Sequence, residues 1–163
     1  MTKGCSVNNN NIPAEDVILF KDGLLGVEHL KKYLLVSSRE NLPFKYLQSI
    51  DDDALAFIVI DPYLYIPNYS FEIFDDVLDE LEVIEASDIL VLSIAVIPSD
   101  LTKMTANFAS PVLINVNNRK GMQIILQDAK YKIRQPIFDI YKTITSQGAM
   151  KCLSWHVNLV RQY

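Results

Sequence analysis

Carboxylates are the most numerous side chains in this sequence that could do chemistry. The densest run is Asp51-Asp52-Asp53, and Asp61 lies one predicted strand downstream. Paired carboxylates can act as acid and base or hold a magnesium ion, which is the pattern of a metal-dependent hydrolase. However, three adjacent side chains cannot all point the same way, and a polar run between two apolar segments is typical of a chain reversal. We therefore favour a structural corner over a carboxylate site here.

The other candidates for catalysis and metal binding are few. His29 and His156 lack the spacing of a zinc site such as His-Glu-x-x-His, and Cys5 and Cys152 lie at opposite ends of the chain. Two idle thiols are favoured over a disulfide. We expect no catalytic residue, no metal and no cofactor, so the protein is predicted not to be an enzyme.

Charge is distributed unevenly along the chain. Residues 1–100 hold six Lys or Arg against eighteen Asp or Glu, whereas residues 101–163 hold nine against two, so the two parts carry net charges of −12 and +7. If the fold keeps these parts separate, the first presents an acidic face suited to a basic partner; if the fold interleaves them, the field cancels.

An acidic amphipathic helix is predicted within residues 71–83. Val77, Leu78 and Leu81 recur at helical spacing. Five carboxylates lie among them: Asp75, Asp76, Asp79, Glu80 and Glu82. They form either an ordinary solvated face or a binding surface for a basic protein, and we give the two interpretations nearly equal weight because like charges this close repel one another.

Basic residues within residues 101–163 suggest an alternative function, direct binding of RNA. Lys130, Lys132 and Arg134 alternate along a predicted strand, and Arg119 and Lys120 occupy a predicted hairpin corner. They would suit a β barrel that binds RNA directly, but few aromatic side chains for base stacking lie nearby. We therefore expect no direct contact with nucleic acid.

The remaining pattern predicts a mainly β protein, a small antiparallel β barrel with one or two short helices. Strands are expected at residues 5–7, 16–20, 33–37, 44–50, 55–60, 89–97, 112–116, 122–126 and 131–135. The run at 89–97 is continuous enough to be buried on both faces. Residues 137–144 fit one helical face, and residues 152–160 are apolar enough to dock. Among the tyrosines Tyr63, Tyr65 and Tyr69, packing on the core is favoured over a binding patch.

The chain is expected to form a barrel domain over residues 1–136 with a C-terminal extension at 137–163. The longest charge-free apolar stretch, residues 89–99, is far shorter than the roughly 20 residues of a membrane-spanning helix. The first residues are polar where a signal peptide needs an apolar segment. We expect a cytoplasmic protein without a membrane partner.

Several segments resemble the FliW family of flagellar assembly factors. They include Ile18-Leu-Phe-Lys-Asp-Gly-Leu-Leu-Gly26, Leu55-Ala-Phe-Ile-Val-Ile-Asp-Pro62, Met104-Thr-Ala-Asn107, Pro111-Val-Leu-Ile-Asn115 and Asn118-Arg-Lys-Gly121. The similarity covers roughly residues 16–136 in order. The chain departs from the family pattern at Leu25, where many relatives have proline, and at Val27, where many have phenylalanine.

The resemblance implies a bacterial cytoplasmic β barrel with two protein partners, flagellin and the translational repressor CsrA. In this partner switch the protein captures CsrA once flagellin has been exported, which relieves repression of flagellin synthesis. On this basis we expect the five carboxylates of the acidic helix to contact CsrA. Five further residues are expected to serve the fold or to contact flagellin: Met104, Asn107, Asn115, Asn118 and Arg119.

Overall fold

A computed structural model describes residues 12–38 and 42–147 of the 163-residue chain. The strand predicted at 5–7, the segment 152–160, both cysteines and His156 lie outside the described residues. Nine strands are assigned: β1 (Ile18–Phe20), β2 (Lys32–Ser37), β3 (Lys45–Ser49), β4 (Ala56–Ile60), β5 (Ile89–Val96), β6 (Thr105–Ala106), β7 (Val112–Asn115), β8 (Lys120–Gln123) and β9 (Gln135–Pro136). The helices are α1 (Pro62–Tyr65), α2 (Asp75–Glu80) and α3 (Phe138–Ser146).

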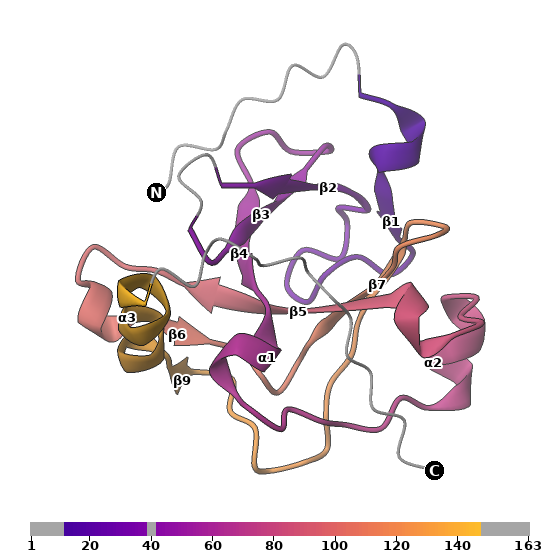
Figure 1. The fold of residues 1–163 in the computed structure, drawn as a ribbon. Helices are drawn as coiled ribbons and strands as arrows, with labels where there is room; N and C mark the ends of the chain where they lie inside the picture. The colour runs from indigo at the N-terminus through magenta and orange to yellow at the C-terminus, as the bar shows by residue number, and fades with distance from the viewer. Residues whose placement is uncertain (1–11, 39–41, 148–163) are drawn as a thin grey trace.

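Seven strands close into a barrel, as predicted (Figure 1). Following the hydrogen bonds, the ring runs β1-β2-β3-β4-β5-β7-β8 and returns to β1. Outside the ring, β6 pairs with the C-terminal end of β5, and β9 pairs with β6. Six of the seven pairings are antiparallel, and closure uses a parallel pairing of β1 with β8. At that seam Gly121 lies against the Phe20 ring, where an added Cβ would lie 2.5 Å from a ring carbon. Glycine is therefore required for β1 and β8 to approach.

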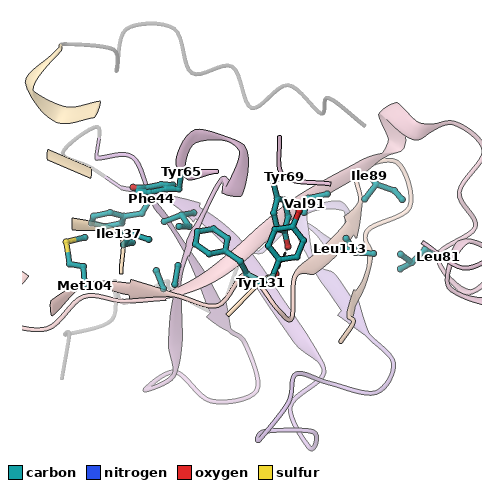
Figure 2. Close-up of a cluster of buried hydrophobic side chains, with 14 residues drawn as sticks. Phe44, Tyr65, Tyr69, Leu81, Ile89, Val91, Met104, Leu113, Tyr131 and Ile137 are labelled. Carbon is teal, nitrogen blue, oxygen red and sulfur yellow. Dashed lines mark hydrogen bonds between the residues drawn. The ribbon is translucent and has the colours of Figure 1, made fainter. Parts of the chain in front are cut away.

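Alternating side chains of the barrel strands supply two hydrophobic cores. On β5, Leu92 and its alternate neighbours face a cluster drawn from β1, β2, β3, β4 and β7, which fills the barrel interior. Ile89, Val91 and Ala95 face a second cluster on the outer wall (Figure 2). The prediction that this strand is buried on both faces is confirmed, and it explains why its sequence is continuously apolar.

Residues 61–83 cross the outer wall and cover the second core. Asp61 accepts a hydrogen bond from the Tyr63 N–H and caps α1. Tyr69 is 3 % exposed and packs edge-on against four aromatic rings. The Tyr131 hydroxyl accepts from the Ser70 N–H at 2.9 Å and donates to the Ser70 carbonyl at 2.8 Å. The tyrosines of residues 63–69 thus serve the core, as favoured from the sequence.

Two predicted strands differ in the structure, and one predicted helix is confirmed. The strand expected at 131–135 exists only at Gln135–Pro136, because the chain turns to bury Tyr131 against the covering segment. The short acidic helix predicted within 71–83 is present at Asp75–Glu80, and the positive φ of 52° at Glu82 prevents its continuation. The strand expected at 122–126 begins and ends earlier, at Lys120–Gln123.

The C-terminal helix α3 packs on the second core. Ile137 is buried just before it, and Phe138, Tyr141 and Ile144 lie against the same cluster, whereas Ile140 is 39 % exposed at the margin. None of the described helices is long and apolar enough to span a membrane. In Figure 1, α3 with β6 and β9 lies at one end of the molecule and α2 at the other.

Candidate partner-binding surface

The acidic helix α2 is positioned by its apolar side. Val77 and Leu78 pack against the second core, and Leu81, which follows the helix, is 1 % exposed. These residues recur at helical spacing, so the remaining positions of the helix face outward. Asp75, Asp76 and Asp79 are exposed there.

The amide of Asn115 fixes the end of this helix. Asn115 closes β7 and is 1 % exposed. Its Nδ2 donates to the Leu81 carbonyl at 2.9 Å and to the Glu82 carbonyl at 3.2 Å, which satisfies acceptors left free at the helix C-terminus. Its Oδ1 accepts from the Asn117 N–H at 2.9 Å and from the Asn118 N–H at 3.4 Å. One buried side chain thus joins the hairpin corner to α2.

Asn118 and Lys120 add contacts from the same corner. Asn118 Nδ2 donates to the Leu81 carbonyl at 3.1 Å and to Glu82 Oε2 at 3.1 Å. Lys120 Nζ lies 2.8 Å from Glu82 Oε1. The hydrogen bond from Lys120 and its charge, with a smaller contribution from Asn118, lower the pKa of Glu82 below its ordinary value. Glu82 is therefore ionised at neutral pH.

A second lysine approaches the helix from β1. Lys21 Nζ lies 2.8 Å from Glu80 Oε1, and this hydrogen bond and charge raise the pKa of Lys21. The two partners are 59 residues apart in sequence. Both groups are solvent-accessible, so the pair adds little stability and chiefly orients the Glu80 side chain.

The surface keeps a strong negative charge in spite of these lysines. Residues 72–88 contain eight carboxylates and no lysine or arginine. The adjoining corner, residues 115–120, adds only Arg119 and Lys120, which leaves a net charge of −6. Lys21, outside these residues, brings one further positive charge through its ion pair with Glu80. The fold therefore brings a small part of the basic half to the acidic half without cancelling its field.

The loop after α2 is held as firmly as the helix end. Asp88 Oδ2 accepts from the Ile84 N–H at 3.1 Å and from the Glu85 N–H at 2.8 Å. Asn117 Nδ2 donates to Asp88 Oδ1 at 2.7 Å, and these hydrogen bonds, led by that from Glu85, lower the pKa of Asp88. The loop and the hairpin corner thus form one rigid unit with α2, which we call the α2 surface: residues 72–88 with 115–120.

The residues predicted at the hairpin divide between two places. Asn115, Asn118 and Arg119 belong to the α2 surface, where Arg119 adopts a φ of 61° that turns the corner. Met104 is 1 % exposed in the second core, away from that surface. Asn107 Oδ1 accepts from the N–H groups of Ala109 and Ser110 and shapes a local turn.

The carboxylates considered for metal binding serve the backbone instead. Asp51 Oδ2 accepts from the Lys31 and Lys32 N–H groups at 2.8 and 2.9 Å, which confirms the structural corner. Burial raises the pKa of Asp61, which caps α1 as described above. Within residues 12–38 and 42–147, no group of three His, Cys, Asp or Glu side chains is arranged to hold a metal ion.

The predicted basic stripe does not form. Lys120 pairs with Glu82 at the α2 surface, whereas Lys130 pairs with Asp128 at 3.0 Å and lies over the Tyr131 ring. Residues 131–134 are not a strand, so Lys132 and Arg134 do not share a strand face.

Sequence reasoning missed several residues of the α2 surface. Lys21 gave no signal, because its partner Glu80 is distant along the chain. Ile84 and Val116 are apolar yet 85 % and 37 % exposed. An isoleucine in an acidic segment after a predicted helix was the available clue.

Comparison with known proteins identifies the family. The model of the family described as FliW protein matches residues 5–137. Flagellar assembly factor FliW of Thermoanaerobacter pseudethanolicus is 42 % identical over 135 residues, covering 82 % of this chain and 90 % of that protein. The protein of the same name from Clostridium beijerinckii is 36 % identical over 123 residues, covering 76 % and 87 %.

A solved structure supports the same conclusion. The crystal structure of the flagellar assembly factor FliW superposes with a TM-score of 0.73 at 32 % identity, covering 78 % of this chain and 89 % of that one. The likeness thus extends from local sequence motifs to the whole barrel. This chain belongs to the FliW family of flagellar assembly factors.

Proposed function

We propose that this protein is a non-catalytic regulatory binding protein of the cytoplasm that holds flagellin before export and captures the translational repressor CsrA. When flagellin is exported, the freed protein takes up CsrA, and translation of flagellin resumes. Family membership supports the flagellar role. The proposal that CsrA is the second partner is supported by the α2 surface, which has a net charge of −6 on a hydrogen-bonded support.

An acidic surface suits CsrA because a protein that binds RNA must present basic groups. Opposite charges steer the two proteins together and raise the association rate, and the effect falls as salt is added. Asp75, Asp76 and Asp79 are the exposed carboxylates of α2, and Glu80 and Glu82 are oriented by their lysine partners. We assign all five to the contact with CsrA.

The hairpin corner is the proposed contact with flagellin. Asn118 is exposed there and Arg119 is half-buried, whereas Met104, Asn107 and Asn115 are assigned to the fold because their side chains are buried or hydrogen-bonded to the backbone. A stable interface covers about 800 Å² on each partner, far more than the corner alone. Flagellin at the corner therefore overlaps α2, and we expect the two partners to compete.

The test is a charge reversal on α2, with CsrA and monomeric flagellin as separate ligands. Asp76→Lys with Glu80→Lys changes the local charge from −6 to −2. We expect the affinity for CsrA to fall at least tenfold at low salt, as measured by calorimetry, with a weaker salt dependence.

The matched control reverses the same number of charges at exposed carboxylates on other elements, Glu15→Lys with Asp139→Lys. It should bind CsrA nearly as well as the unaltered protein. Equal affinity of the α2 variant and the control would refute the assignment of α2. Co-elution of the unaltered protein with neither ligand in size-exclusion chromatography would refute the proposed function.

A further inference from the structure

Two exposed apolar residues of the α2 surface are bonded through their backbones to the same aspartate. Ile84 has the highest exposed fraction among the large hydrophobic residues described, 85 %, and Val116 is 37 % exposed. Both are tied to Asp88: its carboxylate accepts from the Ile84 N–H at 3.1 Å, and its carbonyl accepts from the Val116 N–H at 2.8 Å. A loop and a hairpin distant in sequence therefore meet at Asp88, and each brings one exposed apolar residue there.

Nothing in the fold requires an apolar side chain at position 84. Ile84 belongs to neither hydrophobic core, while Leu81 and Val83 beside it pack inward. Single exposed hydrophobic residues are common on proteins. This one differs because its backbone is held by hydrogen bonds and because a second exposed apolar residue is bonded to the same aspartate.

The backbone is held on both sides of Ile84. The Val83 N–H donates to the Leu78 carbonyl at 2.9 Å, and Glu85 and Asp88 form a reciprocal capping box. Asn117 then fixes Asp88 from the hairpin. A side chain held on such a support loses little conformational freedom on binding, which favours affinity.

The rim of the pair is acidic. Glu82, Glu85 and Asp88 lie within four residues of Ile84, and the exposed Glu85 forms no ion pair among the described residues. An apolar centre with a charged rim is the usual arrangement of an interface in which one residue carries much of the binding energy. The charge of the rim selects lysine or arginine on the partner.

We propose that Ile84 and Val116 are the apolar anchor of the α2 surface, and that the segment bound there presents an apolar side chain flanked by lysine or arginine. This inference rests on the proposed function and specifies how that partner is recognised. The carboxylates provide attraction at long range, and the anchor provides the short-range contact that slows dissociation.

The experiment compares Ile84→Ser with Ile133→Ser in the full chain, with CsrA as the probe. Ile133 is 65 % exposed and lies two residues before β9, at the other end of the molecule from α2 (Figure 1). We expect Ile84→Ser to weaken binding at least tenfold, mainly through faster dissociation. Its salt dependence should equal that of the unaltered protein, because no charge changes. The melting temperature should not fall, since the side chain is exposed.

The outcomes separate the two proposals. If the unaltered protein binds CsrA and the α2 charge reversal weakens binding but Ile84→Ser does not, the anchor is refuted and the proposed function stands. A loss shared equally by Ile133→Ser refutes the anchor as well. If the unaltered protein does not bind CsrA, both proposals fail.

Discussion

Replacing Asn115 tests whether the hairpin corner supports the α2 surface. The side chain is 1 % exposed and makes four hydrogen bonds, two of them at 2.9 Å. A typical bond contributes about 1 kcal/mol, and a buried group left without a partner costs about 1–3 kcal/mol. Asn118 still reaches the Leu81 carbonyl, which limits the loss. We expect Asn115→Ala to destabilise the protein by about 3 kcal/mol.

The assay is urea or thermal unfolding followed by circular dichroism. For a chain of this length a loss of about 3 kcal/mol lowers the melting temperature by about 6–12 °C. Asn117→Ala is the control, because its side chain is exposed and makes a single hydrogen bond to Asp88. A loss below about 1 kcal/mol for Asn115→Ala, or equal losses for the two variants, would refute the reasoning.

Asn115→Asp adds a dependence on pH with a definite sign. The carboxylate would be buried against the Leu81 and Glu82 carbonyls, so its pKa in the folded state would rise above the unfolded value of about 3.9. The folded state then binds more protons than the unfolded state between those two pKa values. Stability therefore falls as pH rises through that window and is recovered in acid. A variant whose stability does not depend on pH relative to the unaltered protein would contradict this.

Two further substitutions test the barrel seam and the covering segment. Gly121→Ala places a Cβ 2.5 Å from a carbon of the Phe20 ring, so we expect it to destabilise the protein by about 1–3 kcal/mol in urea unfolding; an unchanged midpoint would show that the seam relaxes freely. Tyr131→Phe removes both hydrogen bonds to Ser70 and should cost about 1–2 kcal/mol. Tyr65→Phe is its matched control, because the buried Tyr65 hydroxyl has no hydrogen-bond partner among the described residues. Removing the Tyr65 hydroxyl should preserve or increase the stability of the protein. If Tyr131→Phe and Tyr65→Phe lost equal stability, the assigned hydrogen bonds of Tyr131 would be contradicted.

The strands could be predicted where their apolar pattern is local. Residues 89–97 were expected to be buried on both faces, and β5 occupies Ile89–Val96 between the two cores. The continuous apolar run predicts burial on both faces, because alternate residues of a strand point to opposite faces and each buried face needs apolar side chains. The Asp51 corner was predictable for the same reason, since polar residues between apolar strands mark a reversal.

The errors arise where a distant contact overrides the local pattern. Residues 131–135 alternate like a strand, yet the Tyr131 hydroxyl bonds to Ser70, 61 residues away, and the chain turns. The exact end of α2, a helix whose presence was predicted, is also set by distant partners, because Asn115 and Asn118 donate hydrogen bonds to the Leu81 carbonyl beyond it. Neither partner can be seen from the segment itself.

The sequence by itself determined the family, the acidic segment and most of the strands, because sequence motifs, composition and hydrophobic periodicity are properties of neighbouring residues. Tertiary structure alone decided that the asparagine hairpin and the acidic helix form one surface, that Lys21 meets Glu80, and that Ile84 and Val116 are bonded to the same aspartate. The contacts of Asn115 and Val116 depend on the pairing of β5 with β7, and barrel closure through the parallel seam of β1 and β8 brings the end of β1, beside Lys21, to the same side. Hydrogen bonds and ion pairs act over a few ångströms, so their partners are fixed only when the sheet order is fixed.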